Sequence, residues 1–152
     1  MIPIKTAAEL ERMRVACRLS AQLLAEVAAQ VRPGATTGEL DAFAAARMRE
    51  LGVKSAFFGY GGFPGYTCIS LNEEVVHGIP GARAINAGDL VSVDLGVVAD
   101  GFIGDNATTV RVGAVDAESA RLCEVTAAAL YLASEAASGV NGTCLSISGG
   151  EV

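Results

Sequence analysis

The sequence has little of what many metal, nucleic-acid and membrane sites are built from. It contains one histidine and four scattered cysteines without a CxxC pair, so a zinc site made of cysteine and histidine is not expected. Eleven basic against 17 acidic residues give a net charge of −6 without a basic cluster, which argues against nucleic acid and anionic membranes as partners. No apolar run approaches the ~20 residues of a membrane span. Charges come too early for a secretory leader, so we expect a cytoplasmic protein.

Two capping boxes of the form Thr-x-x-Glu, at residues 6–9 and 36–39, predict the first two helices. A third helix is expected from Asp116 to about residue 137. Cys123 and the cysteine of the first helix are interpreted as buried apolar residues. Apolar spacings of three and four predict these scaffold faces: Leu10, Met13, Cys17, Ser20, Leu24, Val27 and Val31 in the first helix, Leu40, Phe43, Ala44, Met48 and Leu51 in the second, and Leu122, Val125, Ala129 and Leu132 in the third.

The order of the elements predicts the fold class. Two helices, a strand-rich stretch from about Ser55 to Val112 and one further helix predict an α+β fold, with an antiparallel sheet and helices packed on one side. At 152 residues the chain is long enough for one domain with its own core. Residues 139–152 show no helical or strand period and no capping signal, so we expect residues 1–152 to be a single, truncated domain.

The central feature is the stretch SVDLGVVADGFIGDNATTVRV. Its Asp-Gly between two alternating apolar runs predicts a β-hairpin. If the turn closes with Val98 opposite Gly101, Asp94 lies opposite Asp105, and a slip of two residues still leaves both on one face. Close carboxylates resist ionising together, so we expect a divalent cation there or, alternatively, an ordinary hairpin with two solvated aspartates. The other face of the first strand is expected to be apolar, with Val91, Val93, Leu95 and Val97.

Two further stretches are candidates for chemistry. His77, in VVHGIP, precedes the hairpin by a short turn, as a neighbouring strand would; it is either a structural histidine or a contact for a substrate amide or carbonyl. GYGGFPGYTCIS does not match a phosphate-binding glycine pattern. Its Tyr60, Phe63 and Tyr66 either line a small apolar pocket beside Cys68 or belong to a plain surface loop. Since no Ser/His/Asp arrangement is found, metal-assisted hydrolysis fits better than acyl-enzyme chemistry.

Four stretches together resemble the bacterial-type methionine aminopeptidases: KTAAELERMRVACRLSAQLL, GYGGFPGYTCISLNEEVVHGIP, GDLVSVDLGVVADGFIGDNATT and RLCEVTAAALYLA. The likeness is collinear from about Met1 to Asn141. The middle two stretches are the most specific, because the single histidine and the two aspartates, eleven residues apart, fall where the family places them. The resemblance implies the pita-bread (creatinase/aminopeptidase) fold, of which this chain covers only the first half, with a dinuclear metal site between two pseudo-symmetric halves.

The resemblance also implies roles for individual residues. Asp94 and Asp105 would be metal ligands, with Asp105 bridging two divalent ions, for which Co, Mn, Fe and Zn are all suitable. His77 would be the catalytic, substrate-contacting histidine. The pocket for the N-terminal methionine would consist of Tyr60, Phe63 and Cys68, with Phe57 at its edge.

The implied reaction is removal of the N-terminal methionine from nascent proteins, close to the ribosome, by a metal-activated water that attacks the first peptide bond. Family members have a second half that supplies another histidine, two glutamate ligands and a further substrate-contacting histidine. For this chain alone we therefore expect weak metal binding, little or no activity, and an exposed sheet face or edge. The alternatives are a non-catalytic pita-bread half that binds a peptide or a partner, and a related peptidase that cleaves before proline, which the VVHGIP and Cys68 stretches disfavour.

Overall fold

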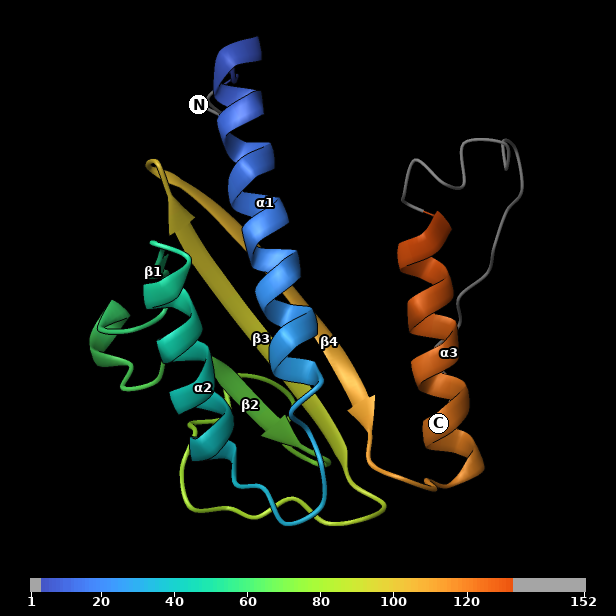
Figure 1. Cartoon of the computed structure of the whole chain (residues 1–152). Coiled ribbons are helices and arrows are strands. Elements are labelled where there is room, and N and C mark those ends of the chain that lie inside the picture. Colours follow the sequence, from blue (N-terminus) through green and yellow to red (C-terminus); the bar gives the residue numbers. More distant parts are fainter. Residues whose placement is uncertain (1–3, 133–152) are drawn as a thin grey trace. The chain divides into compact units, whose positions relative to one another are not determined.

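The computed structural model describes residues 4–132. The chain divides into two compact units, Met1–Ala114 and Val115–Val152. The second unit contains the helix α3 (Ala117–Leu132). The first unit contains, in order, α1 (Ala7–Ala28), α2 (Thr37–Glu50), β1 (Lys54–Ser55), the 3₁₀ turn η1 (Tyr60–Gly62), β2 (Cys68–Leu71), β3 (Leu90–Ala99) and β4 (Phe102–Arg111) (Figure 1). None of the helices within residues 4–132 combines the length and the apolar character needed to span a membrane.

The predicted helix starts are confirmed. Both capping boxes form: the side chain of each threonine N-cap accepts a hydrogen bond from the backbone N–H of the glutamate, at 3.3 Å in α1 and 3.2 Å in α2. In return, each glutamate accepts from the backbone N–H of its threonine at 2.7 Å. In the second unit, Asp116 caps α3 by accepting from the backbone N–H of Ser119 at 2.9 Å. Residues 133–137, predicted to extend this helix, lie outside the described residues.

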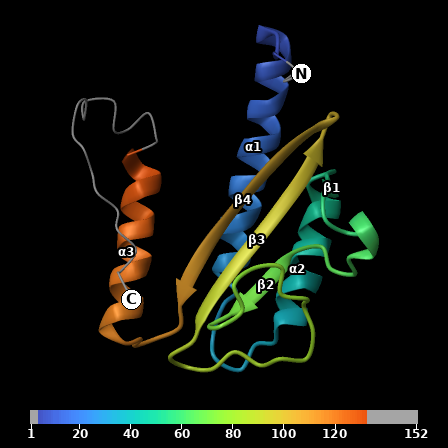
Figure 2. The same cartoon turned by 180° about the vertical axis from the view of Figure 1, so that it is seen from behind.

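β3 is the central strand of the antiparallel sheet. One edge of β3 pairs along its whole length with β4, and the other edge pairs first with β2 and then with β1. The helices α1 and α2 lie on the same face of this sheet, and Figure 2 shows the opposite face, over which neither helix passes. This arrangement confirms the predicted α+β class, with helices packed on one side of an antiparallel sheet.

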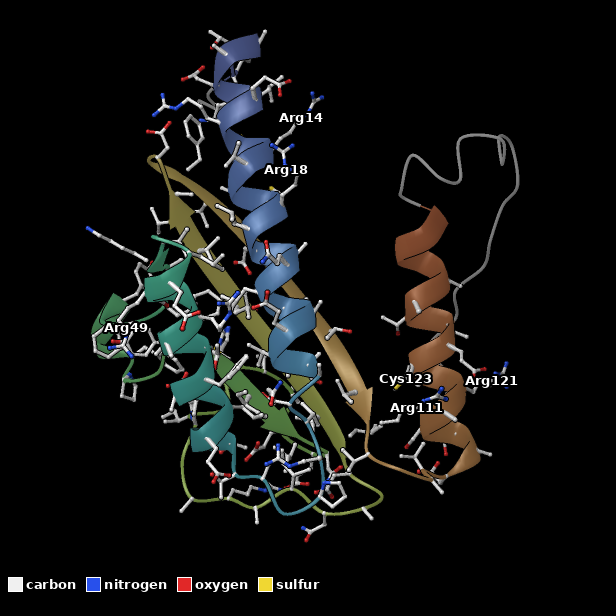
Figure 3. All side chains as sticks on the ribbon, in the orientation of Figure 1. Arg14, Arg18, Arg49, Arg111, Arg121 and Cys123 are labelled. Carbon is white, nitrogen blue, oxygen red and sulfur yellow. The ribbon has the colours of Figure 1, made fainter. Side chains whose placement is uncertain are left out.

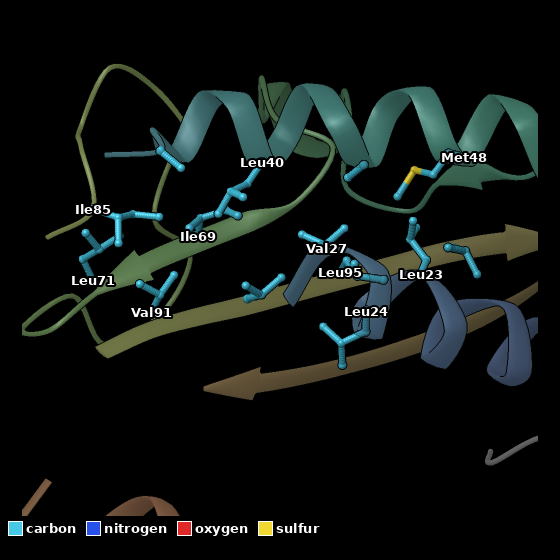
Figure 4. Close-up of a cluster of buried hydrophobic side chains, with 14 of the residues drawn as sticks. Leu23, Leu24, Val27, Leu40, Met48, Ile69, Leu71, Ile85, Val91 and Leu95 are labelled. Atoms are coloured by element: carbon cyan, nitrogen blue, oxygen red, sulfur yellow. The ribbon is translucent and has the colours of Figure 1, made fainter. Parts of the chain in front are cut away.

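The hydrophobic core lies between β3 and these two helices. Alternate residues of β3 point into it and are 0 % exposed, as the sequence pattern predicted: Val91, Val93, Leu95 and Val97. They pack against buried side chains from the helices and from β2, including Leu23, Val27, Leu40, Met48, Ile69 and Leu71 (Figure 4). The other face of β3, which carries Asp94, is therefore left free of the core.

The contact between α1 and β4 corrects the predicted face of the first helix. Ala16 of α1 is completely buried. A Cβ placed on Gly104 of β4 would lie only 2.4 Å from the carbonyl oxygen of Ala16. The absence of a side chain at residue 104 lets the two backbones approach closely. The buried stripe of α1 therefore passes through Ala16, and Cys17, predicted to be buried, is exposed. Cys123 in α3, also predicted to be buried, is only partly so.

The outer edge of β4 is unpaired within residues 4–132. The backbone N–H of Ala56 donates to the carbonyl of Gly96, so the even-numbered residues of β3 direct their backbone groups toward β1, and the odd-numbered ones toward β4. In the β3–β4 register, odd residues of β3 face even residues of β4, such as Thr108. The N–H of Ala107 therefore points to the free edge.

Ala107→Pro is expected to reduce self-association of the 152-residue chain. A long uncovered edge strand pairs with other chains, and proline removes the outward N–H without removing a ladder hydrogen bond to β3. Light scattering behind size exclusion measures the effect. Thr108→Pro is the matched control, because it removes an N–H that faces β3 and should instead destabilise the hairpin. A folded Ala107→Pro variant that associates like the wild type would contradict the assignment of this edge.

Candidate active site

Asp94 and Asp105 lie on the face of the hairpin that the helices do not cover. The register differs by two residues from the predicted one: Asp94 pairs with Ala107 and Asp105 with Gly96, so the two carboxylates are diagonal neighbours rather than directly opposite. The turn explains this difference. The Asp-Gly pair at residues 100–101 has φ values of 49° and 77°, and a two-residue hairpin turn of this kind requires positive φ at both positions. As expected for a slip of two residues, both aspartates remain on one face.

The electrostatics of this face fit a bound cation. Burial raises the pKa of the Asp94 carboxyl above its usual value, the negative charge of Asp105 raises it further, and His77 lowers it. A carboxylate that is costly to ionise beside a second carboxylate is stabilised by a divalent cation with oxygen ligands. Within residues 4–132, however, no group of three or more His, Cys, Asp or Glu side chains is placed to hold a metal. Asp94 and Asp105 are thus two oxygen donors on one face that a divalent cation could use, without a third such side chain beside them among these residues.

Asp94→Asn is expected to stabilise the cation-free protein at pH 7. Because the pKa of Asp94 is raised from 3.8 in the folded state, this group stabilises the fold only while protonated, and that contribution is lost as pH rises through the folded-state pKa. Asparagine avoids the loss, so the variant should unfold at a higher temperature than wild type at pH 7 in EDTA, but not at pH 3. A lower unfolding temperature at pH 7 would contradict this account.

Cys68 lies directly beside Asp94 in the sheet. The two residues are paired across β2 and β3, and Cys68 is 5 % exposed. Burial raises the pKa of its thiol to about 11, and the neighbouring aspartates, Asp94 before Asp105, contribute to the rise. The thiol therefore stays neutral at pH 7 and presents a polarizable apolar surface next to the carboxylates.

Cys68 is expected to react with iodoacetamide about 100-fold more slowly than Cys17 at pH 7.5. Thiolate is the reactive form, and at pH 7.5 a thiol with a pKa of about 11 is ionised far less often than an ordinary thiol with a pKa of ~8.5. In addition, Cys68 is buried, whereas Cys17 is exposed on α1. Timed alkylation followed by peptide mass spectrometry gives both rates in one sample. Equal rates would show that Cys68 is not held in a buried, anionic environment.

His77 lies in the long loop between β2 and β3. Residues 72–89, all within the described part of the chain, contain no strand, so the prediction that His77 sits on a neighbouring strand one short turn before the hairpin is wrong. The loop still returns to β2, because the N–H of Ile69 donates to the carbonyl of Gly78 at 3.0 Å. A Cβ on Gly78 would lie 2.2 Å from the Ile69 carbonyl oxygen, so this approach needs glycine. The charge of His77 acts on Asp94 only by lowering the pKa of that carboxyl, against the larger effects of burial and Asp105.

The predicted pocket residues are brought to the aspartates to different degrees. The ring of Phe57 lies over Gly96, the residue paired with Asp105, and Cys68 adjoins the other aspartate. Phe63 is partly buried, whereas Tyr60, in η1, is 82 % exposed. Of the pocket candidates, Cys68 is therefore paired directly with an aspartate, and Phe57 lies over the glycine that is paired with the other one.

Tyr66 belongs to a different pocket from the one predicted. Its ring stacks on Phe58 with a centroid separation of 4.4 Å. Both rings line a pocket of about 300 Å³ against α2, together with Met48 and Arg49 but without Cys68. Arg49, labelled in Figure 3, belongs to the last turn of α2. Tyr66 thus anchors the loop between β1 and β2, residues 56–67, to the helix side of the sheet.

Sequence reasoning missed the two side chains that hold this loop. One carboxylate oxygen of Asp41, on α2, accepts three hydrogen bonds, from the backbone N–H of Tyr66, the backbone N–H of Thr67 and the Thr67 hydroxyl, at 2.7–2.8 Å. The hydroxyl of Ser55 donates to the Tyr66 carbonyl at 2.8 Å and accepts from the backbone N–H of Phe57 at 3.0 Å. The only sequence signal was an acidic residue beside the buried stripe of the second helix.

Comparison with solved structures defines the class of fold. The chain superposes on methionine aminopeptidase from Thermotoga maritima with a TM-score of 0.84 and 42 % identity, covering 88 % of this chain and 54 % of that one. It superposes less well on prolidase from Pyrococcus furiosus, with a TM-score of 0.72 and 25 % identity, covering 83 % of this chain and 36 % of that one. The fold is the pita-bread fold, as the resemblance implied, and the chain covers part of it.

Sequence comparison gives the family. Residues 11–147 match the profile of metallopeptidase family M24. The chain is also 45 % identical to the methionine aminopeptidase of Borreliella burgdorferi over an alignment of 128 residues. This alignment covers 84 % of this chain and 51 % of that protein. The chain belongs to metallopeptidase family M24. It spans about half the length of the curated relatives that it matches.

Proposed function

We propose that the protein removes the N-terminal methionine from nascent polypeptides, and that these 152 residues supply the first part of its active site. The observation that carries the proposal is the placement of Asp94 and Asp105 beside Cys68 on the open sheet face. It is supported by the identity of 41–45 % to curated relatives named methionine aminopeptidase, and by TM-scores of 0.80–0.84 with solved methionine aminopeptidases against 0.72 with a prolidase. We also propose that the 152 residues belong to a single pita-bread domain, of which they form the first half, and that the protein acts in the cytoplasm, close to the ribosome.

Asp94 and Asp105 are the residues proposed to hold two divalent cations, of which Co, Mn, Fe and Zn all accept such oxygen ligands. When bound, the cations supply Lewis-acid activation of water and of the scissile carbonyl. Asp105, the more exposed of the two, would contribute its carboxylate to the ions together with Asp94. His77, in the loop between β2 and β3, is proposed to bind the scissile amide or its carbonyl and so to orient it for cleavage.

The substrate's methionine side chain is proposed to occupy a pocket formed by Phe57, Tyr60, Phe63 and Cys68. The neutral thiol of Cys68 and the ring of Phe57 offer polarizable surface suited to a thioether. Tyr60 and Phe63 lie on the loop that the Asp41 carboxylate holds from its far end, and we propose that they close over the bound side chain.

The proposal is tested with the product of the complete reading frame. It should release methionine from Met-Ala-Ser, lose this activity in EDTA and regain it with Mn²⁺, while the 152-residue chain alone shows little turnover. Cleavage restricted to peptides with proline in second place would replace methionine release by prolidase-type activity. Stable peptide binding without any hydrolysis would favour the alternative of a non-catalytic binding half.

A further inference from the structure

Gly96 is the one buried residue of β3 on the aspartate face, and it is covered by Ala56 and the ring of Phe57. The backbone carbonyl of Gly96 accepts from the N–H of Ala56 at 2.9 Å, which brings residues 56 and 57 over it. A Cβ built on Gly96 would lie 3.0 Å from both the Ala56 Cβ and the Phe57 Cε1. Phe57 therefore occupies the space that a side chain at residue 96 would need.

The contact between Phe57 and Gly96 lies next to both aspartates. Gly96 is two residues from Asp94 along β3 and directly opposite Asp105 on β4. Cys68 adjoins Asp94 from the β2 side of the strand, and Phe57 approaches Gly96 from the neighbouring β1 side. A group anchored at the two carboxylates and extending toward this edge of β3 meets the Phe57 ring and the Cys68 sulfur.

The backbone that carries Phe57 is also fixed. Its N–H donates to the Ser55 hydroxyl, which in turn holds the Tyr66 carbonyl, and its carbonyl accepts from the N–H of Tyr60 at 2.9 Å. A wall built on such a backbone resists displacement by a ligand, which is the condition for discrimination by size.

We propose that Phe57 and Gly96 form a matched pair that sets the width of the substrate side-chain pocket, with Gly96 lacking a side chain so that the Phe57 ring can stand beside the carboxylates. This inference rests on the proposed aminopeptidase function. It assigns to the pair the exclusion of N-terminal residues that are wider than an unbranched thioether side chain, such as phenylalanine.

The packing of Phe57 against Gly96 is tested by thermal unfolding, without an activity assay. Gly96→Val should lower the unfolding temperature by about 4 °C or more in the wild-type background, because a branched side chain overfills the space taken by the ring. In a Phe57→Ala background, Gly96→Val should lower the unfolding temperature by less than half as much. An equal loss in both backgrounds would overturn the pairing, whether or not the protein is an aminopeptidase.

The specificity half is tested with the product of the complete reading frame. Phe57→Ala should raise kcat/KM for Phe-Ala-Ser relative to Met-Ala-Ser by about 10-fold, since the space left by the ring admits the wider side chain. Phe58→Ala is the matched control, because this adjacent ring stacks on Tyr66 against α2 and should leave the ratio unchanged. An unchanged ratio in an active Phe57→Ala enzyme would overturn the role of Phe57. Absence of hydrolysis in the wild type would instead reject the proposed function, and the thermal coupling would still decide the pairing.

Discussion

Asp94→Asn and Asp105→Asn are each expected to lower kcat/KM for methionine release by at least about 100-fold. Loss of a group that only supports a metal ligand typically costs ~10–100-fold, and these carboxylates are proposed to bind the ions directly. An amide is a neutral and weaker ligand for divalent cations, so Mn²⁺ affinity should fall together with activity. Steady-state kinetics and calorimetric Mn²⁺ titration of the complete reading-frame product measure the two effects side by side.

The control for this prediction is Glu11→Gln. Glu11 is an exposed residue of α1 that pairs with Arg14, so the substitution also removes one negative charge but lies in another part of the fold. It should leave both Mn²⁺ affinity and activity unchanged. Stability separates the two causes of inactivity, because Asp94→Asn should be inactive although more stable than wild type in EDTA at pH 7. Wild-type activity in either aspartate variant would refute the ligand assignment.

Gly104→Ala is expected to destabilise the protein by about 2 kcal/mol or more. The added Cβ would lie 2.4 Å from the Ala16 carbonyl oxygen and 2.7 Å from the Cys17 backbone nitrogen, so α1 and β4 must separate. Separation also strains the hydrogen bond at 2.7 Å between the buried Ser20 hydroxyl and the Asn106 side chain, which joins the same two elements. Elsewhere in a strand interior, glycine to alanine is favourable by roughly 0.5–1 kcal/mol, so even the sign of the effect is diagnostic.

Urea unfolding measures the free energy of unfolding of Gly104→Ala, and a substitution at a second glycine serves as the matched control. Gly81 has no heavy atom within 4 Å of a Cβ built on it and does not have a positive φ, so Gly81→Ala should change stability little. If Gly104→Ala were as stable as Gly81→Ala, the close approach of α1 to β4 would be wrong. The exposure of Cys17, which follows from the same contact, would then also need another explanation.

The features that the sequence predicted correctly depend on local chemistry. The two Thr-x-x-Glu boxes need only four consecutive residues, and both form. The burial of Val91, Val93, Leu95 and Val97 follows from the alternation of a strand with one covered face. The same alternation kept Asp94 and Asp105 on one face even though the register was off by two.

The features that were missed depend on contacts between distant segments. Whether Ala16 or Cys17 faces the sheet is decided by Gly104, about ninety positions along the chain, and a helical stripe alone does not fix that choice. The register was missed because the turn places positive φ at Asp100 and Gly101 rather than one residue earlier. The role of Asp41 is similarly non-local, since its three donors come from a loop 25 and 26 residues away.

The most direct test of the central claim, that Asp94 and Asp105 bind the metal, is anomalous diffraction. Crystals of the complete reading-frame product grown with Mn²⁺ would be measured at the manganese absorption edge. The account predicts anomalous peaks within coordination distance of both carboxylates, on the open face of β3 and β4. Well-ordered Asp94 and Asp105 side chains without a peak between them, or peaks only elsewhere in the protein, would contradict it.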